Sequence, residues 1–176
     1  YSQPKKNNNT IIDLTQLIQD VIILLKNKED ISSKKQIVFE GTTDHLILNG
    51  DEEQIKQVVW NLCINALEAM SRGTLTLTLK EVFSFQSGEF QANHRGMVLE
   101  VQDEGCGIAL DQISNIYDPF YSSKKNGVGL GLATVYQIVN RNKGVMDVKS
   151  TVGKGTLFTV FLPDQDSVKP VPMPSH

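Results

Sequence analysis

Two asparagines, Asn61 and Asn65, stand one helical turn apart in the stretch VVWNLCINALEAM, which otherwise has the apolar spacing of a buried helix. An amide side chain buried without partners costs roughly 1–3 kcal/mol, so each needs a backbone group or a ligand. On a helical projection Asn61, Asn65 and Glu68 form one stripe at the edge of the apolar face, where it can face a cleft. An amide oxygen is a neutral ligand suited to Mg²⁺, which is held mainly through substrate phosphates. The pattern leaves a backbone cap and a ligand site both open.

A second candidate is the segment DEGCGI, which directly follows a strand-like run. Gly105 and Gly107 permit positive φ and a close approach of the backbone to another group. Asp103 supplies a hydrogen-bond acceptor at the end of the strand. A ligand-binding loop and a plain turn both explain this segment when it is taken alone.

A third candidate is the segment NGVGLGLATV, in which Gly127, Gly129 and Gly131 precede a helical pattern. Amide N–H groups exposed at a helix N-terminus, together with the helix dipole, favour the binding of a phosphate. The segment lacks the G-K-[ST] ending of a P-loop, so that mechanism is excluded. A flexible hinge is the alternative explanation of the glycines.

Between these glycine-rich segments lies the stretch YDPFYSSKK, residues 117–125. An aromatic pair followed by serines and lysines at this place predicts a lid with an apolar latch at Phe120. A surface loop anchored by one phenylalanine is the alternative.

Three amphipathic helices are expected to position these residues. Apolar residues at helical spacing predict the helices over residues 14–27, 52–71 and 130–142. Asp13 with Gln16, and Asp51 with Gln54, stand three residues apart in capping-box arrangements at the first two helix starts.

Six short runs predict strands: QIVFEG, HLILNG, TLTLTLK, MVLEVQD, VMDVKS and TLFTVFLP. The alternation in TLTLTLK places leucines on one face and threonines on the other, which is typical of a half-buried strand. Residues 81–96 lack a stable period and are expected to form a long connection. Because the last two runs are joined by the turn TVGKG, the pattern favours an α/β two-layer sandwich over a doubly wound parallel sheet.

The composition is that of an ordinary globular domain, with 176 residues, 40% hydrophobic residues and a formal charge of −3. No broad excess of Lys and Arg suggests nucleic acid as a partner. Cys63 and Cys106 do not make a disulfide framework, so a cytoplasmic location is expected. No apolar run reaches the ~20 residues of a membrane span. Tyr1 in place of Met suggests a fragment, and the sequence leaves open whether the parent protein is membrane-bound.

Taken in order, these segments resemble the ATP-binding catalytic domain of sensor histidine kinases, within the GHKL ATPase superfamily. The segment QVVWNLCINALEAM resembles the N box, DEGCGI the first glycine box and DPFYSSK the F box. The segment GVGLGLATV resembles the second glycine box, and GKGTLFTVFLP the final Gly-Thr strand. The short lid and NALEAM are similar to the nitrogen-regulation class. The resemblance implies the GHKL fold, an α/β two-layer sandwich in which a mixed, mostly antiparallel sheet packs on about three helices.

The resemblance also divides the chain into three parts. Residues 1–10 are expected to be a linker from a missing phosphoacceptor hairpin, and residues 11–163 the ATP-binding catalytic domain. Residues 164–176 are polar and proline-bearing, which predicts a disordered tail.

The implied function is to bind Mg-ATP (or ADP) and to deliver the γ-phosphate to a histidine on a separate helical hairpin domain. That histidine passes the phosphate to an aspartate of a response-regulator receiver domain, and catalysis is largely positioning and charge neutralisation. The parent kinase is expected to be a homodimer and this fragment a monomer. Three alternatives are a degenerate nucleotide-binding module without phosphotransfer, an ATP-hydrolysing relative of the topoisomerase or mismatch-repair kind, and a protein-serine kinase of the anti-sigma type. The intact motifs disfavour the first, and the opening YSQPKK disfavours the last.

The resemblance implies roles for individual residues. Asn65 is expected to coordinate Mg²⁺, and Asp103 to accept a hydrogen bond from the adenine amino group. Gly107 and Ile108 are expected to line the base pocket, with Thr156 at the adenine end. The whole expected nucleotide site comprises Asn61, Asn65, Glu68, Ala69, Asp103, Gly105, Gly107, Ile108, Phe120, Ser123, Lys124, Gly127, Val128, Gly129, Leu130, Gly131, Leu132 and Thr156.

Catalytic roles are expected for Asn61, which would orient Mg²⁺-bound water or phosphate oxygens, and for Lys124, which would approach the phosphates. Many relatives carry Lys where this chain has Glu68. Because a carboxylate cannot bind phosphate directly, the metal or the cations Lys124, Lys125 and Arg72 must supply the positive charge. None of the three histidines lies in an H-[ED]-x-x-x-P setting, so the phosphoacceptor is expected to be absent.

Overall fold

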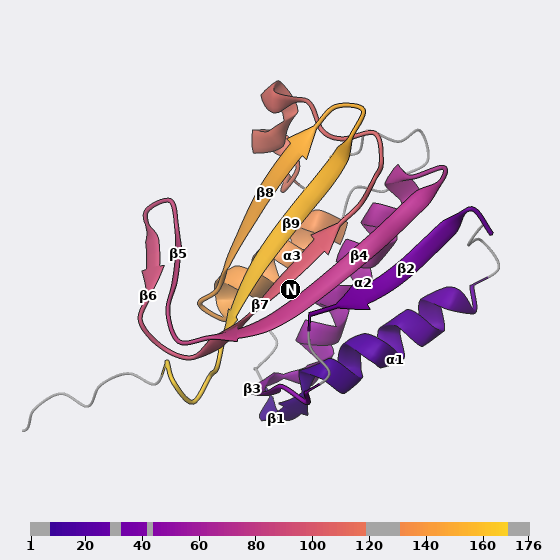
Figure 1. Ribbon diagram of the computed structural model, residues 1–176. Coiled ribbons are helices and arrows are strands. Elements are labelled where there is room, and N and C mark those ends of the chain that lie inside the picture. The colour runs from indigo at the N-terminus through magenta and orange to yellow at the C-terminus, as the bar shows by residue number, and fades with distance from the viewer. Residues whose placement is uncertain (1–7, 29–32, 42–43, 119–130, 169–176) are drawn as a thin grey trace, which may run out of the picture.

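A computed structural model describes residues 8–28, 33–41, 44–118 and 131–168 (Figure 1). The elements are β1 (Asn9–Asp13), α1 (Leu14–Lys26), β2 (Lys35–Glu40), β3 (Ile47–Asp51), α2 (Glu52–Ala69), β4 (Gly73–Val82), β5 (Phe85–Ser87), β6 (Phe90–Ala92), β7 (Gly96–Gln102), a 3₁₀ turn (Leu110–Asn115), α3 (Gly131–Arg141), β8 (Val145–Thr151) and β9 (Gly155–Pro163). Within these described parts of the chain, no helix is long and apolar enough to cross a membrane.

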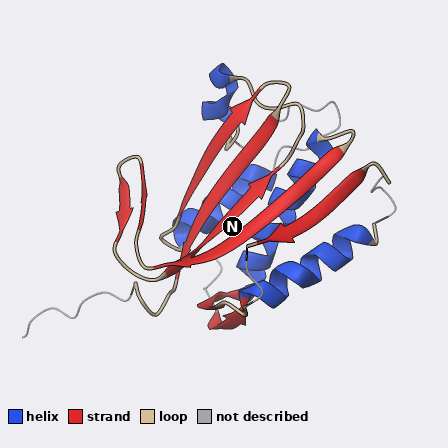
Figure 2. Cartoon of the chain, viewed as in Figure 1, coloured by secondary structure: helices blue, strands red, loops and turns tan. Residues whose placement is uncertain are grey.

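The main sheet has five strands in the order β2-β4-β7-β9-β8. The β2–β4 pair is parallel, and the other three pairs are antiparallel. Figure 2 shows this sheet in front with α2 and α3 behind it and α1 beside its lower right edge, so the domain has two layers. The expected two-layer sandwich, with a mixed and mostly antiparallel sheet on three α-helices, is confirmed.

Both predicted N-caps are present at the helix starts, while the Gln16 side chain donates to Asp20 at 2.9 Å and the Gln54 side chain accepts from Asn142 at 2.8 Å. The Asp13 Oδ1 atom accepts a hydrogen bond from the Gln16 N–H at 3.0 Å, and Asp51 Oδ1 accepts one from the Gln54 N–H at 3.1 Å. Each cap satisfies one of the N–H groups that a helix leaves without an internal partner. The two helices therefore begin where the sequence places them.

The core lies between the helices and the inner face of the sheet. On β4 the side chains of Leu75, Leu77 and Leu79 are at most 1% exposed, while the threonines between them face outward. On α2 the side chains of Val58 and Leu62 are fully buried against this layer. Burying a leucine or valine side chain contributes roughly 1.5–3 kcal/mol, so this alternation alone specifies which face of β4 meets α2.

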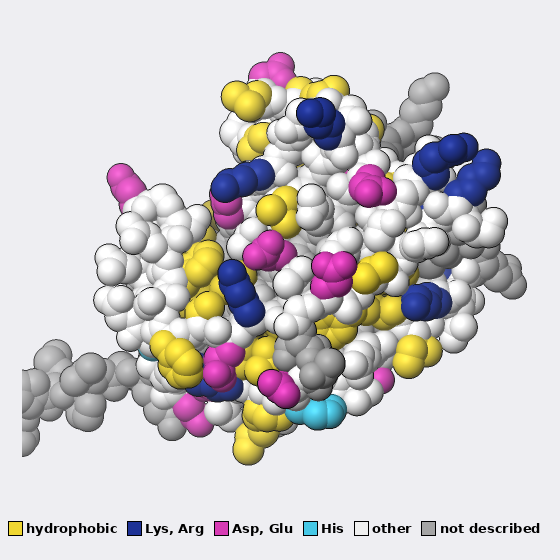
Figure 3. All heavy atoms as spheres, viewed as in Figure 1, with side chains coloured by type: hydrophobic (Ala, Val, Ile, Leu, Met, Phe, Trp, Pro, Cys, Tyr) yellow, Lys and Arg dark blue, Asp and Glu magenta, His cyan; other side chains and the backbone are white. Residues whose placement is uncertain are grey.

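Residues 81–96, expected as a long connection, contain the short antiparallel hairpin β5–β6. The Phe85 ring stacks on Phe161 of β9 with centroids 5.0 Å apart, and the Phe90 ring lies 6.0 Å from the same ring. The hairpin thus covers an apolar spot on the outer face of the sheet. Elsewhere that face carries charges of both signs, such as Lys80 and Glu100 at 3.9 Å (Figure 3).

The ordered chain extends past both boundaries expected for the domain. Residues 9 and 10, placed in the linker, pair with β3 as part of β1. Asp164, placed in the disordered tail, is 3% exposed and accepts a hydrogen bond from Arg95. The Gln165 side chain donates to the Asn142 carbonyl at 2.9 Å. A buried carboxylate paired with a guanidinium holds residues 164–168 on the domain, whereas their composition alone indicates only polarity.

Stability is expected to fall as the pH rises above about 9. Burial raises the pKa of the Cys63 thiol on α2 from its ordinary 9.0 to about 12. Burial, with Asp147 and Tyr136 nearby, raises the pKa of Tyr117 from 10.0 to about 12. Between the ordinary and the raised pKa of each group, the unfolded chain has released a proton that the folded chain retains. The free energy of unfolding therefore falls by up to ~1.4 kcal/mol per pH unit for each group.

Urea unfolding at half-unit steps from pH 8 to pH 11 measures this effect. The Cys63→Ala variant is expected to lose less stability than the parent chain between pH 9 and pH 10, because the contribution of the thiol is then removed while that of Tyr117 remains. Parallel profiles for the two proteins over that interval would contradict the assignment to Cys63.

Candidate functional site

Asn61 and Asn65 lie at the edge of α2, where both side chains are half-buried rather than fully buried. The Asn61 amide donates a weak hydrogen bond of 3.4 Å to the carbonyl of Gly131 at the start of α3. Asn61 therefore has a backbone partner, as expected if its side chain caps a neighbouring backbone group. Glu68 is exposed. Both asparagines can still be reached by a ligand because neither is enclosed in the core.

Asp103 lies immediately after β7 and is 3% exposed. Its Oδ1 atom accepts hydrogen bonds from the N–H groups of Gly105 at 2.8 Å and Thr156 at 3.2 Å. The Asp103 N–H in turn donates to the Thr156 carbonyl at 2.9 Å, which continues the pairing of β7 with β9. The carboxylate is thus held rigidly in place by backbone groups, and a rigid buried carboxylate is a selective acceptor for a donor-bearing ligand.

The loop after Asp103 packs closely between α2 and the β8–β9 turn. A Cβ atom on Gly105 would lie 2.6 Å from the Ala69 carbonyl oxygen, and one on Gly107 would lie 2.3 Å from the Thr151 carbonyl oxygen. Gly107 also has a φ of +76°. The close approach expected of both glycines is confirmed, and a positive φ is present at Gly107 alone of the two.

Ser150 on β8 is a residue that the sequence interpretation missed. Its Oγ atom accepts a hydrogen bond from the Ile108 N–H at 2.7 Å and lies 2.8 Å from the Thr156 Oγ1 atom. The two hydroxyl residues are direct partners in the register of β8 and β9. The turn TVGKG was the available signal, because a tight turn makes the residues on its two sides neighbours across the strands.

Along α2, Asn61, Asn65 and Ala69 follow one another at four-residue spacing, which places them on one face of the helix. The stripe begins beside Gly131, whose Cβ position lies 3.9 Å from Asn61, and ends against Gly105. Its length along the helix axis is about 12 Å. The amides and the start of α3 thus form one end of the site, and the Asp103 loop forms the other.

Several expected site residues lie outside the described residues: Phe120, Ser123, Lys124, Gly127, Val128, Gly129 and Leu130. The chain on both sides of them is described. Ile116 is 1% exposed, and the Tyr117 ring stacks on Tyr136 of α3 with centroids 4.9 Å apart and an interplanar angle of 18°. Gly131 and Leu132 open α3, with the Leu132 side chain packed against the core. The two flanks of residues 119–130 are therefore joined by the tyrosine pair.

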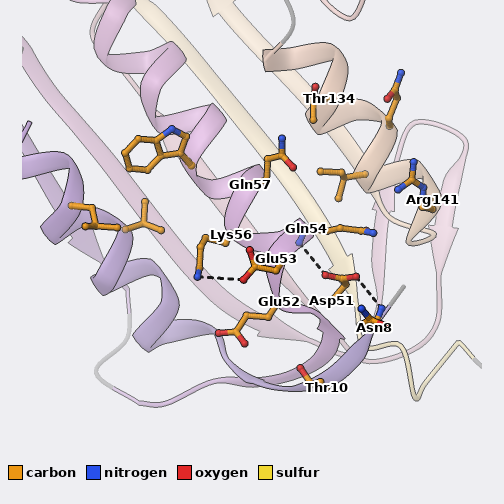
Figure 4. A pocket seen from close by; sticks show the side chains of 15 residues that line it. Asn8, Thr10, Asp51, Glu52, Glu53, Gln54, Lys56, Gln57, Thr134 and Arg141 are labelled. Carbon is orange, nitrogen blue, oxygen red and sulfur yellow. Dashed lines mark hydrogen bonds and ion pairs between the residues drawn. The ribbon is translucent and has the colours of Figure 1, made fainter. Parts of the chain in front are cut away.

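A separate groove of about 940 Å³ lies among α1, α2 and α3 (Figure 4). Trp60 and Leu24 contribute its apolar part, and Glu53 and Lys56, 3.7 Å apart, contribute charges. The Asp51 carboxylate in this lining accepts hydrogen bonds from the Gln54 N–H, which caps α2, and from the Asn8 N–H. None of the expected nucleotide residues that the structure describes lines this groove, so it is distinct from the site formed by Asn61, Asn65 and Asp103.

Most of this chain matches a family of known proteins. Residues 50–166 match the family described as the histidine kinase-, DNA gyrase B-, and HSP90-like ATPases. The chain belongs to this ATPase family, which indicates a nucleotide-binding domain.

Curated relatives place the chain near the sensor kinases of the family. It is 30% identical over 164 residues to the signal transduction histidine-protein kinase AtoS of Escherichia coli (strain K12), covering 93% of this chain and 25% of AtoS. It is 33% identical over 159 residues to sporulation kinase C of Bacillus subtilis (strain 168), covering 90% of this chain and 32% of the relative. The chain thus spans a quarter to a third of the length of these relatives.

Solved structures confirm the expected fold. The catalytic domain of histidine kinase ThkA superposes with a TM-score of 0.72 at 24% identity, covering 89% of this chain and 96% of that one. Full-length ShkA in complex with AMPPNP gives a TM-score of 0.75 at 22% identity, covering 92% of this chain and 32% of that one. The resemblance to the catalytic domains of sensor histidine kinases is therefore confirmed in family and in fold.

Proposed function

We propose that this chain is the catalytic ATP-binding domain of a two-component sensor histidine kinase. It binds Mg-ATP and delivers the γ-phosphate to a histidine on a separate helical hairpin domain, which passes it to an aspartate of a response-regulator receiver domain. The observation that carries the proposal is the buried Asp103 carboxylate, fixed by two backbone N–H groups at one end of a stripe whose other end is the start of α3. The catalytic unit comprises residues 11–163 together with residues 9, 10 and 164–168, which pack on it, and the parent kinase is a homodimer.

At the adenine end, Asp103 accepts a hydrogen bond from the amino group of the base. The fixed geometry of its carboxylate supports this role, because a preorganised acceptor discriminates between an amino group and an oxo group. Thr156 and Ile108 complete the recognition of the base, with Gly107 allowing the loop to approach it closely. Ala69 forms the wall on the α2 side.

At the phosphate end, Asn65 coordinates Mg²⁺ through its amide oxygen, and Asn61 orients water or phosphate oxygens. Neutral amides on a half-exposed helix edge fit a metal that arrives with its phosphates and keeps several waters. Bound Mg²⁺ neutralises charge on the phosphates. The N–H groups at the start of α3, from Gly131 onward, face an anion with the favourable end of the helix dipole. Lys124 supplies positive charge in place of the lysine that many relatives carry at the position of Glu68.

Asn61 also explains how ATP is preserved for transfer. In relatives that hydrolyse ATP, a glutamate one turn before the metal-binding asparagine activates water, and this chain has Asn61 there. An amide cannot accept a proton at neutral pH, and general-base help typically contributes ~10²–10⁴-fold. The bound γ-phosphate is therefore protected from water until a histidine reaches it.

The isolated chain is expected to bind ATP with Mg²⁺, to hydrolyse it very slowly, and to phosphorylate a hairpin domain supplied in trans. Transfer is weak because the tether that raises the effective concentration is absent. The chain itself is not expected to acquire an acid-labile phosphohistidine. Labelled ATP followed by gel analysis measures both transfer and self-labelling.

The Asn65→Ala variant is expected to lose Mg²⁺-dependent ATP binding. Asn140→Ala, on the exposed side of α3, serves as the matched control and should bind normally. Steady multiple turnover of ATP by the parent chain would favour a hydrolase instead. ATP binding without transfer to any hairpin domain would favour a degenerate nucleotide-binding module.

A further inference from the structure

The Ser150 hydroxyl connects three segments that surround the proposed base pocket. Besides its contacts with Ile108 and Thr156, the Oγ atom lies 3.0 Å from the Gly155 carbonyl oxygen. Thr156 is 5% exposed and its N–H donates to Asp103. Ser150 on β8, Thr156 on β9 and Asp103 just after β7 therefore form a row across three adjacent chain segments.

The protons in this row can be counted. A serine hydroxyl has one proton to donate and two lone pairs that accept. One lone pair of Ser150 is used by the Ile108 N–H, so its proton goes either to the Gly155 carbonyl or to Thr156 Oγ1. When it goes to Gly155, Thr156 donates to Ser150 and can only accept from a ligand. When it goes to Thr156, the threonine proton is available to a ligand.

We infer that Ser150 is a positioning residue for base recognition, which acts by making Thr156 a hydrogen-bond donor. In the ligand-bound state the Ile108 N–H donates to Ser150, Ser150 donates to Thr156, and Thr156 donates toward a ring nitrogen of adenine, directly or through water. Hydrogen bonds that run in one direction polarise one another and strengthen the last donor. Asp103 accepts a hydrogen bond from the adenine amino group. The Thr156 donor and the Asp103 acceptor therefore match the ring nitrogen and the amino group on that edge of the base. This inference rests on the proposed function.

Isothermal titration of ATP against matched variants tests the relay. Ser150→Ala and Thr156→Val are each expected to weaken ATP binding about five- to tenfold, the effect of one lost hydrogen bond in a desolvated site. The double variant is expected to bind no more weakly than either single variant, because each change breaks the same relay. Ser150→Thr keeps the hydroxyl and should bind within about twofold of the parent chain. Thr159→Ala, on the outer face of β9, removes a hydroxyl outside the row and should bind normally.

Mg-tripolyphosphate, which has phosphates but no base, separates positioning from a merely structural role. Its affinity is expected to be the same in Ser150→Ala as in the parent chain. Equal losses for ATP and tripolyphosphate would overturn the inference, as would additive effects in the double variant. Failure of the parent chain to bind ATP would overturn the proposed function itself. Melting temperatures of all variants verify that the proteins compared are folded.

Discussion

Replacing Asp103 by asparagine is expected to abolish the binding of adenine nucleotides while the domain stays folded. The amide oxygen of the new side chain can keep the hydrogen bonds from Gly105 and Thr156 that now end on Oδ1. The amide NH₂ then replaces the other carboxylate oxygen and sets a donor against the donor of the adenine amino group. A site built to pair with one polar group rejects its mismatch strongly, so we expect a loss in affinity of roughly 100-fold or more.

Titration with a fluorescent ATP analogue measures the loss, and circular dichroism with thermal melting measures the fold. Asp103→Ala is the informative companion, because it also removes the acceptor for the two backbone N–H groups and is expected to lower stability as well. Asp111→Asn makes the same chemical change on an exposed turn and should leave binding unchanged. Normal ATP affinity in Asp103→Asn would remove the assignment of the base pocket.

The second large effect is expected from Gly155→Ala at the first residue of β9, just after the β8–β9 turn. A Cβ atom there would lie 2.1 Å from the Asp103 carbonyl oxygen, and the residue has a φ of +136° that side chains rarely adopt. Backbone strain and the forced movement of β7 together cost roughly 3–5 kcal/mol. For a domain of this size the melting temperature should fall by roughly 6–20 °C.

Gly153 in that turn provides the matched control. Its φ is +82°, but no atom lies within 4 Å of the position of a Cβ. Gly153→Ala therefore carries only the backbone strain, roughly 1–2 kcal/mol. Differential scanning calorimetry of the two variants compares strain alone with strain plus contact. Equal losses would show that the close approach of Gly155 to Asp103 contributes nothing to stability.

The elements that could be predicted from the sequence are those whose signal is local. Asp13 and Asp51 mark helix starts because the capping bond spans three residues, and the alternation of β4 identifies its buried face directly. The β5–β6 hairpin escaped prediction because each strand has three residues, too few for a period, and its anchor Phe161 is remote in the chain. Asp164 escaped for the same reason, since its partner Arg95 lies 69 residues away.

The same distinction between local and remote signals holds for the residues of the site. Asp103, Gly105 and Gly107 could be selected because a carboxylate and two glycines follow a strand within one short segment. Asn61 lies at the edge of the apolar face, as its spacing predicts, but its contact with the start of α3 could not be predicted because periodicity does not specify that packing. The hydrogen bond of Ser150 to Ile108 could not be predicted, because it requires the loop after β7 to fold back onto β8.

The stacked pair of Tyr117 and Tyr136 bears on how far the two described flanks of residues 119–130 can separate. The ring centroids lie 4.9 Å apart, so the chain before these residues and the helix after them are anchored to each other through side chains. An aromatic pair of this kind contributes roughly 0.5–1.5 kcal/mol beyond the burial of its area. The entropic cost of bringing these two flanks together is therefore offset in part by the tyrosines themselves.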